Sequence, residues 1–367
     1  MAITDEAKFE IWLDSQPQEV CATIAARAAA RVLPFATHSY MEDATGDLKT
    51  IAFITARAIL SSGAALKTPA SETLLAARSA CSAIDLALSS RSITNSLSAG
   101  STFGSPALFA AYSSASLASS ARSSTNWAAR AAKTPALIAA YADTEHPVAE
   151  LFLLPIWPES TWPDSMQAAL EGQYDIFADA PEYAFWREWY DGLLTGKPLD
   201  WELQRRVAVI PDADWEQGPE HIAERIEVIR AKYEVETRAA ELEKLASEEV
   251  QRSQTRGIGD NNPPETREAE HSNDPVTIIW ASARDLREEA QAKTPDKGKV
   301  RQSIDTISKV LKACGLWAAK KLDLGIDAAM KVAGAAGATY GIAWLTQNAD
   351  KIAEFLTWAQ KWLVALI

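Results

Sequence analysis

The sequence predicts a mostly α-helical protein built from successive helical segments. Apolar residues recur at three- and four-residue spacing along most of the chain, which is typical of amphipathic helices. Alanine, the strongest helix former, dominates the first half. No run of alternating β-branched residues is long enough to indicate a sheet; the nearest case, residues 207–211, ends a short amphipathic helical pattern.

The chain of 367 residues is long enough for two or three domains with buried cores. Changes in composition divide it into segments. The expected segments are an Ala-rich helical bundle (1–150), a Trp-rich helical region that ends in a long projecting helix (151–250), a flexible, disordered linker (251–274) and a basic, apolar C-terminal helical module (275–367).

The Ala-rich bundle is predicted from four helical runs. Pro17 suits the first turn of a helix, and Pro34 is expected to stop that helix, because proline breaks a helix interior. Further runs cover residues 47–60, 71–88 and 105–132. An arginine flanked by small residues recurs at Arg27, Arg57, Arg78, Arg122 and Arg130. We expect each arginine stem to lie in a helix seam with its charged head in water; the alternative is a basic face that binds anions.

The Trp-rich region holds six of the 13 tryptophans between Trp157 and Trp215. Pro181 opens a helix with a broad aromatic face, formed by Phe185, Trp186, Trp189, Tyr190 and Leu193. We expect this face to be buried in the core, because tryptophan more often packs than forms a ligand cage; another subunit or a ligand are the alternatives. Gly196 is expected to end this helix, and Asp200 to cap the next.

A long helix is predicted from Pro219, with an apolar seam that is clear up to Tyr233. After Tyr233 the seam weakens and charges lie on all sides, so we expect this part to project from the body. The stretch that follows, RGIGDNNPPE at residues 256–265, contains glycines, asparagines and two adjacent prolines. Such a composition favours a linker.

Two sequence motifs resemble motifs found together in uncharacterised bacterial proteins. The first is GIG-x-N-x-PP at residues 257–264, and the second is WxxWYxxLLxGxPL at residues 186–199. The resemblance implies a bacterial protein. It carries no assigned activity, so it gives no residue a functional role.

The C-terminal module is basic and apolar. Residues 293–367 hold 11 Lys and Arg against 6 Asp and Glu, whereas the whole chain has a net charge of −13. Between Lys331 and Asp350 lie 18 uncharged residues, slightly fewer than the roughly 20 that span a bilayer. Gly337 and Gly341, with Gly334 one turn earlier, form a flat helix face of the kind that permits close helix contact in lipid.

These features support two interpretations of the module. In the first, a helical hairpin acts on a membrane: its glycines set helix contact, its tryptophans set membrane depth and its lysines meet anionic lipid. In the second, the same helices form a soluble oligomerisation or docking domain for a protein partner. The residues assigned to membrane or helix contact are Gly334, Gly337, Gly341, Trp344, Trp358, Trp362, Lys320, Lys321, Lys331 and Lys361.

No motif for catalysis, a cofactor or a metal is recognisable in the sequence. The four histidines lack the spacing of metal ligands. Asp212, Asp214 and Glu216 alternate as in a calcium loop, but Gln217 and Ala223 stand where that loop requires Gly and Glu. We therefore expect no catalytic residue, cofactor or metal; an enzyme whose site is assembled only in space is the third hypothesis.

Charge and cysteine content indicate the compartment and exclude one class of partner. The strongly negative net charge argues against a nucleic-acid partner. The first residues contain no apolar signal segment, and the distant, odd-numbered Cys21, Cys81 and Cys314 suit free thiols in a reducing cytoplasm. We expect a cytoplasmic protein whose C-terminal module lies at or in the inner membrane.

The function predicted from these patterns is non-enzymatic. A helical binding or sensing body is tethered to a membrane-active, pore-forming C-terminal hairpin, and the protein acts as a homo-oligomer. The alternative is a soluble scaffold or oligomerisation protein whose C-terminal helices dock a protein partner.

Overall fold

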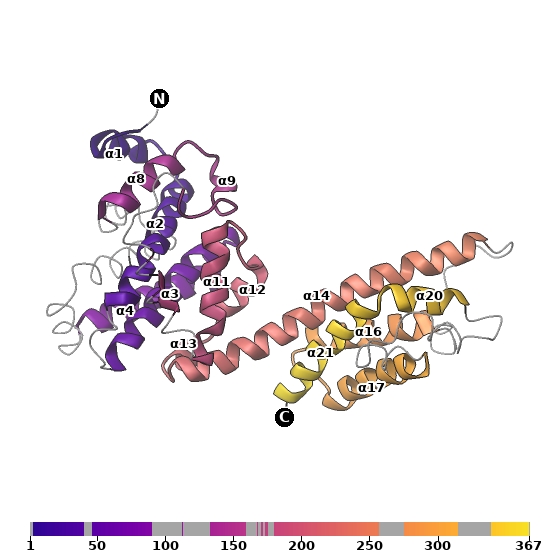
Figure 1. Cartoon of the computed structure of the whole chain (residues 1–367). Helices are drawn as coiled ribbons and strands as arrows, with labels where there is room; N and C mark the ends of the chain where they lie inside the picture. The colour runs from indigo at the N-terminus through magenta and orange to yellow at the C-terminus, as the bar shows by residue number, and fades with distance from the viewer. Residues whose placement is uncertain are drawn as a thin grey trace. The chain divides into compact units, whose positions relative to one another are not determined.

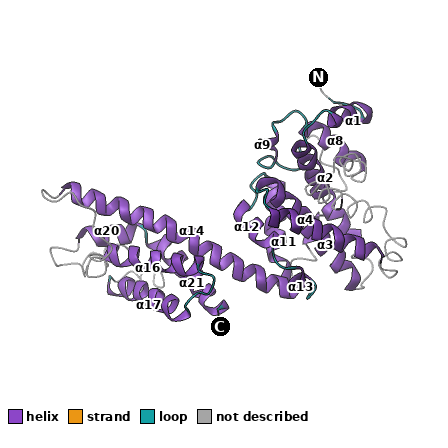
Figure 2. Ribbon diagram, turned by 180° about the vertical axis from the view of Figure 1, so that it is seen from behind, coloured by secondary structure: helices purple, strands orange, loops and turns teal. Residues whose placement is uncertain are grey.

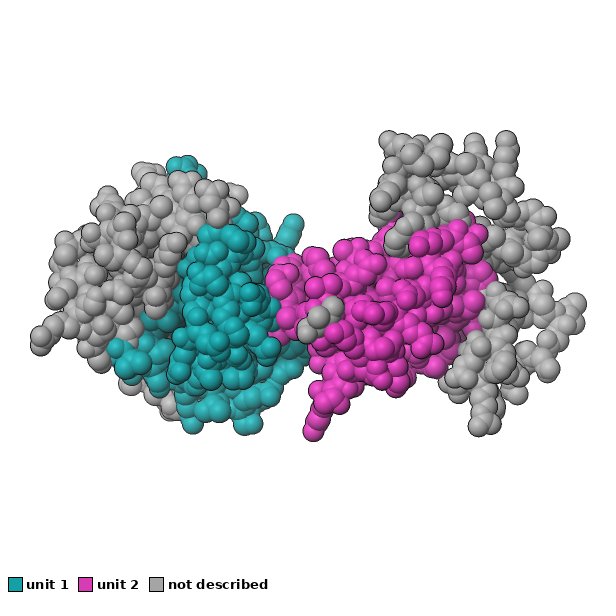
Figure 3. Space-filling view, turned by 90° about the horizontal axis from the view of Figure 1, so that it is seen from below, with its two compact units in different colours: residues 1–226 teal, residues 227–367 magenta. Residues whose placement is uncertain are grey.

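The computed structural model is all-α in the residues that it describes, as the sequence predicts; no strand occurs among them (Figures 1 and 2). The described residues are 3–39, 46–89, 112, 133–158, 167, 170–171, 173–174, 180–256, 275–314 and 339–366. The chain forms two compact units, residues 1–226 and 227–367, which we call the first and second unit (Figure 3).

The first unit is built around three long helices. Helix α3 packs on both α2 and α4, α12 packs on α3 and α4, and α8 and α9 pack on α2. Its described elements are α1 (Glu6–Asp14), α2 (Gln18–Ser39), α3 (Gly46–Lys67), α4 (Ser71–Ser89), α8 (Lys133–Asp143), α9 (Val148–Leu151), η3 (Pro181–Tyr183), α11 (Ala184–Thr195), α12 (Trp201–Ala208) and α13 (Asp212–Trp215). The helical run predicted at residues 105–132 lies outside the described residues, apart from Tyr112.

Helix α2 differs from the prediction at Pro34. The helix does not stop there but continues to Ser39, with the proline in its interior. Pro34 has no backbone N–H to give to the carbonyl of Ala30, which would be its normal helical partner. The buried hydroxyl of Tyr190, on α11, donates to that carbonyl at 3.1 Å. A tertiary hydrogen bond therefore satisfies the acceptor that proline leaves open, and all residues from 21 to 34 are buried.

The aromatic face predicted on α11 is buried, as expected. Trp186 contacts Phe53 of α3 and Trp215 of α13, with ring centroids 5.8 and 6.2 Å apart. Gly196 ends the helix in a left-handed conformation with φ 68°, and a Cβ there would lie 2.8 Å from the carbonyl oxygen of Leu153. Asp200 caps α12 as predicted, because its carboxylate accepts from two backbone amides of the first turn.

The second unit begins inside the longest helix. Helix α14 (Pro219–Arg256) starts in the first unit, and its residues from Glu227 onward belong to the second. The other described helices are α16 (Pro275–Gln291), α17 (Lys297–Ala313), α20 (Thr339–Gln347) and α21 (Ala349–Ala365). Helix α17 packs on α16 and α21, and α20 packs on α16 and α21. The domain boundaries predicted from composition remain predictions; the contacts divide the chain at 226/227.

Helix α14 keeps an apolar seam beyond Tyr233, contrary to the sequence expectation that charges lie on all sides there. Its seam continues through Ala231, Val235, Ala239, Leu242 and Ala246, all of which are buried. Three of these five residues are alanines, whose small apolar surface contributes little to a hydropathy pattern. The seam therefore weakens in the sequence while the helix remains packed.

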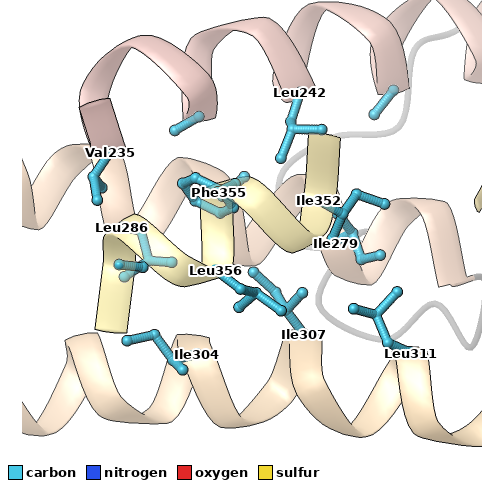
Figure 4. Packing of buried hydrophobic residues seen from close by; sticks show 14 of the residues in the cluster. Val235, Leu242, Ile279, Leu286, Ile304, Ile307, Leu311, Ile352, Phe355 and Leu356 are labelled. Atoms are coloured by element: carbon cyan, nitrogen blue, oxygen red, sulfur yellow. The ribbon is translucent and has the colours of Figure 1, made fainter. Parts of the chain in front are cut away.

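The core of the second unit is formed by side chains from α14, α16, α17, α20 and α21. Figure 4 shows Val235 and Leu242 of α14, Ile279 and Leu286 of α16, Ile304, Ile307 and Leu311 of α17, and Ile352, Phe355 and Leu356 of α21. Phe355 and Ile352 have no exposed surface. The last helix of the described chain is thus an integral part of this core.

Candidate functional site

The residues that the sequence assigns to membrane or helix contact have different positions in the structure. Gly334, Gly337, Lys320, Lys321 and Lys331 lie outside the described residues, as does the GIG-x-N-x-PP motif. The remaining residues lie on the last two helices: Gly341 and Trp344 on α20, and Trp358, Lys361 and Trp362 on α21.

Trp344 and Trp362 are core residues of the second unit. Trp344 is 5% exposed and Trp362 only 1%. In this conformation neither ring is available to a membrane surface, because both belong to the hydrophobic core of the second unit. Any contact of these two rings with lipid requires α20 and α21 to leave the bundle.

Trp358 is only partly buried, and two cations lie close to its ring. The Lys361 ammonium is 4.2 Å from the centre of its ring, and the Arg230 guanidinium, on α14, is 5.7 Å away. Both positions suit a cation–π interaction, which contributes about 0.5–1 kcal/mol at exposed sites. Trp358 and Lys361 thus remain near the surface, where a partner can reach them.

Ion pairs also connect α21 to α14. The Arg238 guanidinium contacts Glu234 on its own helix at 2.9 Å and Glu354 of α21 at 2.8 Å. Lys351 of α21 contacts Glu241 of α14 at 2.5 Å. Glu354 and Glu241, which accept these two contacts between α14 and α21, are both about half exposed. Exposed pairs of this kind are worth roughly 0–1 kcal/mol each, so the apolar core contributes most of the attachment of α21.

The outward face of α17 is basic. Val300, Ile304, Ile307 and Leu311 point into the core, and the opposite side carries Arg301, Lys309 and Lys312 with one carboxylate, Asp305. All four charged residues are exposed. We call Arg301, Lys309 and Lys312 the basic face of α17. The sequence predicts a basic, apolar C-terminal helical module but assigns no role to these three cations.

Two of the five recurring arginines, Arg27 and Arg57, are buried, which corrects the expectation that their heads lie in water, whereas Arg78 is exposed as expected and Arg122 and Arg130 lie outside the described residues. Arg27 is 2% exposed, Arg31 has no exposed surface and Arg57 is 4% exposed. Two of them share one carboxylate, Asp143 at the end of α8. Arg27 binds it in a bidentate manner at 3.0 Å through Nε and Nη2, and Arg31 Nη2 lies 2.8 Å away.

The same guanidinium groups organise the segment that follows α9. Arg27 donates to the carbonyl oxygens of Leu154 at 3.0 Å and Pro155 at 2.9 Å. Arg31 donates through Nε to the carbonyl of Ile156. Burial lowers the pKa of Arg31 to about 10, although Asp143 opposes this shift, so the group stays charged at neutral pH. The network holds a loop in place and offers no open face to an external anion.

Arg31 belongs to this network of buried ion pairs, but the sequence pattern of recurring arginines did not include it. It lies one helical turn after Arg27, in a stretch of the helix, residues 24–36, that otherwise contains only alanine and apolar residues. Two arginines at this spacing without an acidic neighbour on the same helix require a distant carboxylate. That signal is present in the sequence, but it does not identify Asp143.

Asp212 and Asp214, two of the three alternating carboxylates noted in the sequence, have different partners. Asp212 pairs with Arg57, which lies 4.5 Å over the Trp215 ring, and also accepts from Ser79 at 2.5 Å. Asp214 instead contacts His221 at 2.9 Å. Among the described residues, no group of three or more His, Cys, Asp or Glu side chains is arranged to hold a metal ion.

The cysteines have the character of packing residues. Cys21 is buried, and its thiol donates to the carbonyl of Leu13 at 3.4 Å. Burial raises the pKa of the Cys81 thiol to about 12, and burial also raises the pKa of Cys314. Thiols with raised pKa values are poor nucleophiles at neutral pH.

Two further findings bear on the class of protein. In the part of the chain that the structure describes, no helix combines the length and the apolar character needed to cross a membrane. Comparison with protein-family models, curated proteins and solved structures finds no match.

Proposed function

We propose that this chain is a non-enzymatic interaction protein whose second unit is a folded docking module. The observation that supports this most strongly is the closed core of that unit. Phe355 and Trp362 of the last helix are almost fully buried among residues of α14, α16 and α17. Helices that complete a core in this way suit a docking domain better than a hairpin held ready for lipid.

The partner of the docking module carries negative charge. The basic face of α17 presents Arg301, Lys309 and Lys312 to solvent with Asp305 as the only acidic residue among them. Opposite charges across an interface speed association and favour the correct partner. An acidic protein surface and an anionic lipid headgroup layer share this chemistry, and the experiment below distinguishes them.

Binding to two defined anionic probes tests the proposal. The full-length chain is titrated with poly-L-glutamate and, separately, with vesicles containing phosphatidylglycerol. We expect binding to the polypeptide that weakens as ionic strength rises, because salt screens exposed charges. In Arg301→Gln/Lys309→Gln/Lys312→Gln the affinity should fall about tenfold or more.

A matched variant controls for net charge. Lys232→Gln/Lys244→Gln/Lys293→Gln removes three cations of the second unit away from the basic face, and should bind like the wild type. Binding to vesicles alone would identify lipid as the partner. The docking proposal is contradicted if neither probe binds, or if both triple variants lose affinity equally.

Membrane action by a released hairpin is a second candidate, favoured by the exposed contacts between α21 and α14. Arg238 and Lys351 hold α21 through ion pairs that are weak individually. Dye leakage from anionic vesicles tests this candidate. Arg238→Glu/Lys351→Glu should loosen α21 and increase leakage, whereas Lys232→Glu/Lys244→Glu should not. An absence of leakage with every variant would exclude this candidate.

A further inference from the structure

One end of the first unit is formed by the helices that surround a small apolar cluster. The buried members of this cluster are Phe9 and Leu13 of α1, Cys21 and Ile24 of α2, Ala140 and Tyr141 of α8, and Leu151 of α9. Figure 1 shows α1, α8 and α9 close to the N-terminus. The surface around the cluster therefore combines residues 3–20 with residues 144–153, which are distant in the chain.

The surface at this end is acidic. Four carboxylate side chains there are exposed, and we call them the acidic end of the first unit: Asp14, Glu19, Glu145 and Glu150. Residues 3–20 and 144–153 contain one lysine, Lys8, and no arginine. The Lys8 ammonium lies 2.6 Å from the carboxylate of Asp5, so its charge is already balanced within the chain.

The same end also exposes large apolar side chains. Ile11 of α1 is 72% exposed, and Leu153, which directly follows α9, is 60% exposed. Ile138 of α8 is 48% exposed, although the neighbouring Leu137 packs against the cluster. Among the described residues, these are three of the six large apolar side chains that are exposed. Exposed apolar side chains with charged neighbours are typical of protein–protein contact surfaces.

The two units differ in charge. Residues 1–226 hold 16 Lys and Arg against 28 Asp and Glu, whereas residues 227–367 hold 20 against 21. The first unit is therefore strongly acidic, and the second is nearly neutral and carries the basic face of α17. Opposite charges across an interface favour association, whereas like charges oppose it. Two first units consequently repel each other, while a first unit attracts the basic face of α17.

We propose that the basic face of α17 docks on the acidic end of the first unit of a second copy of this chain. This inference rests on the proposed docking function, because it names the acidic partner of that face. The three cations of α17 would pair with carboxylates of the acidic end, and the contact would cover Ile11. Because the two surfaces differ, the contact is heterologous: it closes when two copies exchange contacts, or it continues as an open chain of copies.

Sedimentation equilibrium of the full-length chain measures this self-association. We expect the average mass to rise with protein concentration at low salt, and to fall towards the mass of one chain as sodium chloride is added. Two charge reversals should each weaken self-association about tenfold or more, because they place like charges opposite one another. They are the α17 variant, Arg301→Glu/Lys309→Glu/Lys312→Glu, and the acidic-end variant, Asp14→Lys/Glu145→Lys/Glu150→Lys.

The choice of positions keeps both variants folded. All six side chains are exposed, so the helical circular dichroism spectrum should match that of the wild type. Glu19 is left unchanged, because a cation in the first turn of α2 would oppose the helix dipole.

Mixing the two variants gives the sharpest test. The α17 variant keeps the acidic end, and the acidic-end variant keeps the basic face, so a mixture contains both native surfaces on different molecules. We expect the equimolar mixture to associate although neither variant associates alone. Self-association through an unrelated surface would not depend on mixing.

Two matched variants control for changes of net charge. Lys232→Glu/Lys244→Glu/Lys293→Glu alters three cations of the second unit outside the basic face. Glu171→Lys/Glu216→Lys/Glu224→Lys alters three exposed carboxylates of the first unit outside the acidic end. Both should self-associate much as the wild type does.

The inference is overturned if the wild type remains a single chain at low salt, or if the mixture associates no better than its two components. Self-association that persists in both charge-reversal variants would also overturn it, because the contact would then lie elsewhere. A wild type that stays a single chain but binds poly-L-glutamate would refute the second copy as the partner and leave the docking function intact.

Discussion

At the scale of single residues, the most consequential feature is the carboxylate of Asp143. It is 2% exposed and neutralises two buried guanidinium groups, which also hold the backbone from Leu151 to Ile156. Two arginines and one aspartate leave a net positive charge inside the first unit. Such an arrangement is stable only while every member keeps its hydrogen bonds.

Asp143→Asn should therefore destabilise the first unit severely. The amide keeps the shape of the carboxylate but leaves both arginines without a counter-charge, and breaking a buried ion pair costs about 3–5 kcal/mol. Hydrogen exchange measured by mass spectrometry on peptides from α2 and α11 reports the loss. Asp14→Asn, at the exposed end of α1, is the control and should change stability by less than about 0.5 kcal/mol. Equal effects of both substitutions would contradict the role of Asp143.

Glu202 should make the first unit sensitive to acid. Hydrogen bonds from Arg205 and, to a smaller extent, Arg206 lower the pKa of Glu202 to about 2, at distances of 2.6 and 2.9 Å. A carboxyl group with a lowered folded-state pKa adds stability above its unfolded pKa of about 4.3. This contribution disappears as the pH falls from there through about 2.

The wild type should consequently be more stable than Glu202→Gln above about pH 5, and the difference should shrink to nothing near pH 2. Urea unfolding of both proteins across this range gives the difference directly. Because other carboxyl groups titrate in both proteins, only the difference is informative. A difference that does not change with pH would show that the pKa of Glu202 is not lowered.

At the scale of elements, tertiary contacts decide where helices end. Pro34 should stop α2 on local grounds, yet the Tyr190 hydroxyl compensates for the missing backbone donor. Gly196, in contrast, ends α11 as the sequence predicts, because its left-handed conformation is a local property. A helix end that depends on one residue can be read from sequence, whereas one that depends on a distant donor cannot.

Tyr190→Phe should destabilise the first unit by about 1–2 kcal/mol, since the Ala30 carbonyl would lose the hydroxyl that donates to it in place of a backbone N–H. Pro34→Ala restores a backbone N–H to the helix. In the Tyr190→Phe background it should recover part of the lost stability, and a double-mutant cycle by urea unfolding measures this coupling. Strict additivity of the two substitutions would show that the hydroxyl does not serve the carbonyl opened by Pro34.

At the scale of the whole molecule, the helix α14 is shared between two units that have separate cores. Phe355 lies in the core of the second unit only, with no exposed surface. Phe355→Ala should cost about 3–5 kcal/mol there, from lost burial and the cavity that remains. Hydrogen exchange should accelerate in α16, α17 and α21 and stay unchanged in α2 and α11. Equal acceleration in both units would show that they unfold together.

Sequence periodicity predicted most of the helices, and composition predicted the buried aromatic face of α11. Both predictions rest on local or pairwise regularities, namely residue spacing and a preference of large apolar rings for the core. The candidate sites were harder to predict. Trp358 and Trp362 are four residues apart on one helix, yet one remains near the surface and the other is buried.

By itself, the sequence determined the all-α class, the helix caps at Gly196 and Asp200, and the basic character of α17, because each follows from residue types close together in the chain. Only the tertiary structure decided that Asp143 neutralises Arg27 and Arg31, that α14 belongs to two units, and that α1, α8 and α9 meet around one apolar cluster. These features join residues far apart in sequence. Their positions follow from how the helices pack, which the spacing within any one helix does not specify.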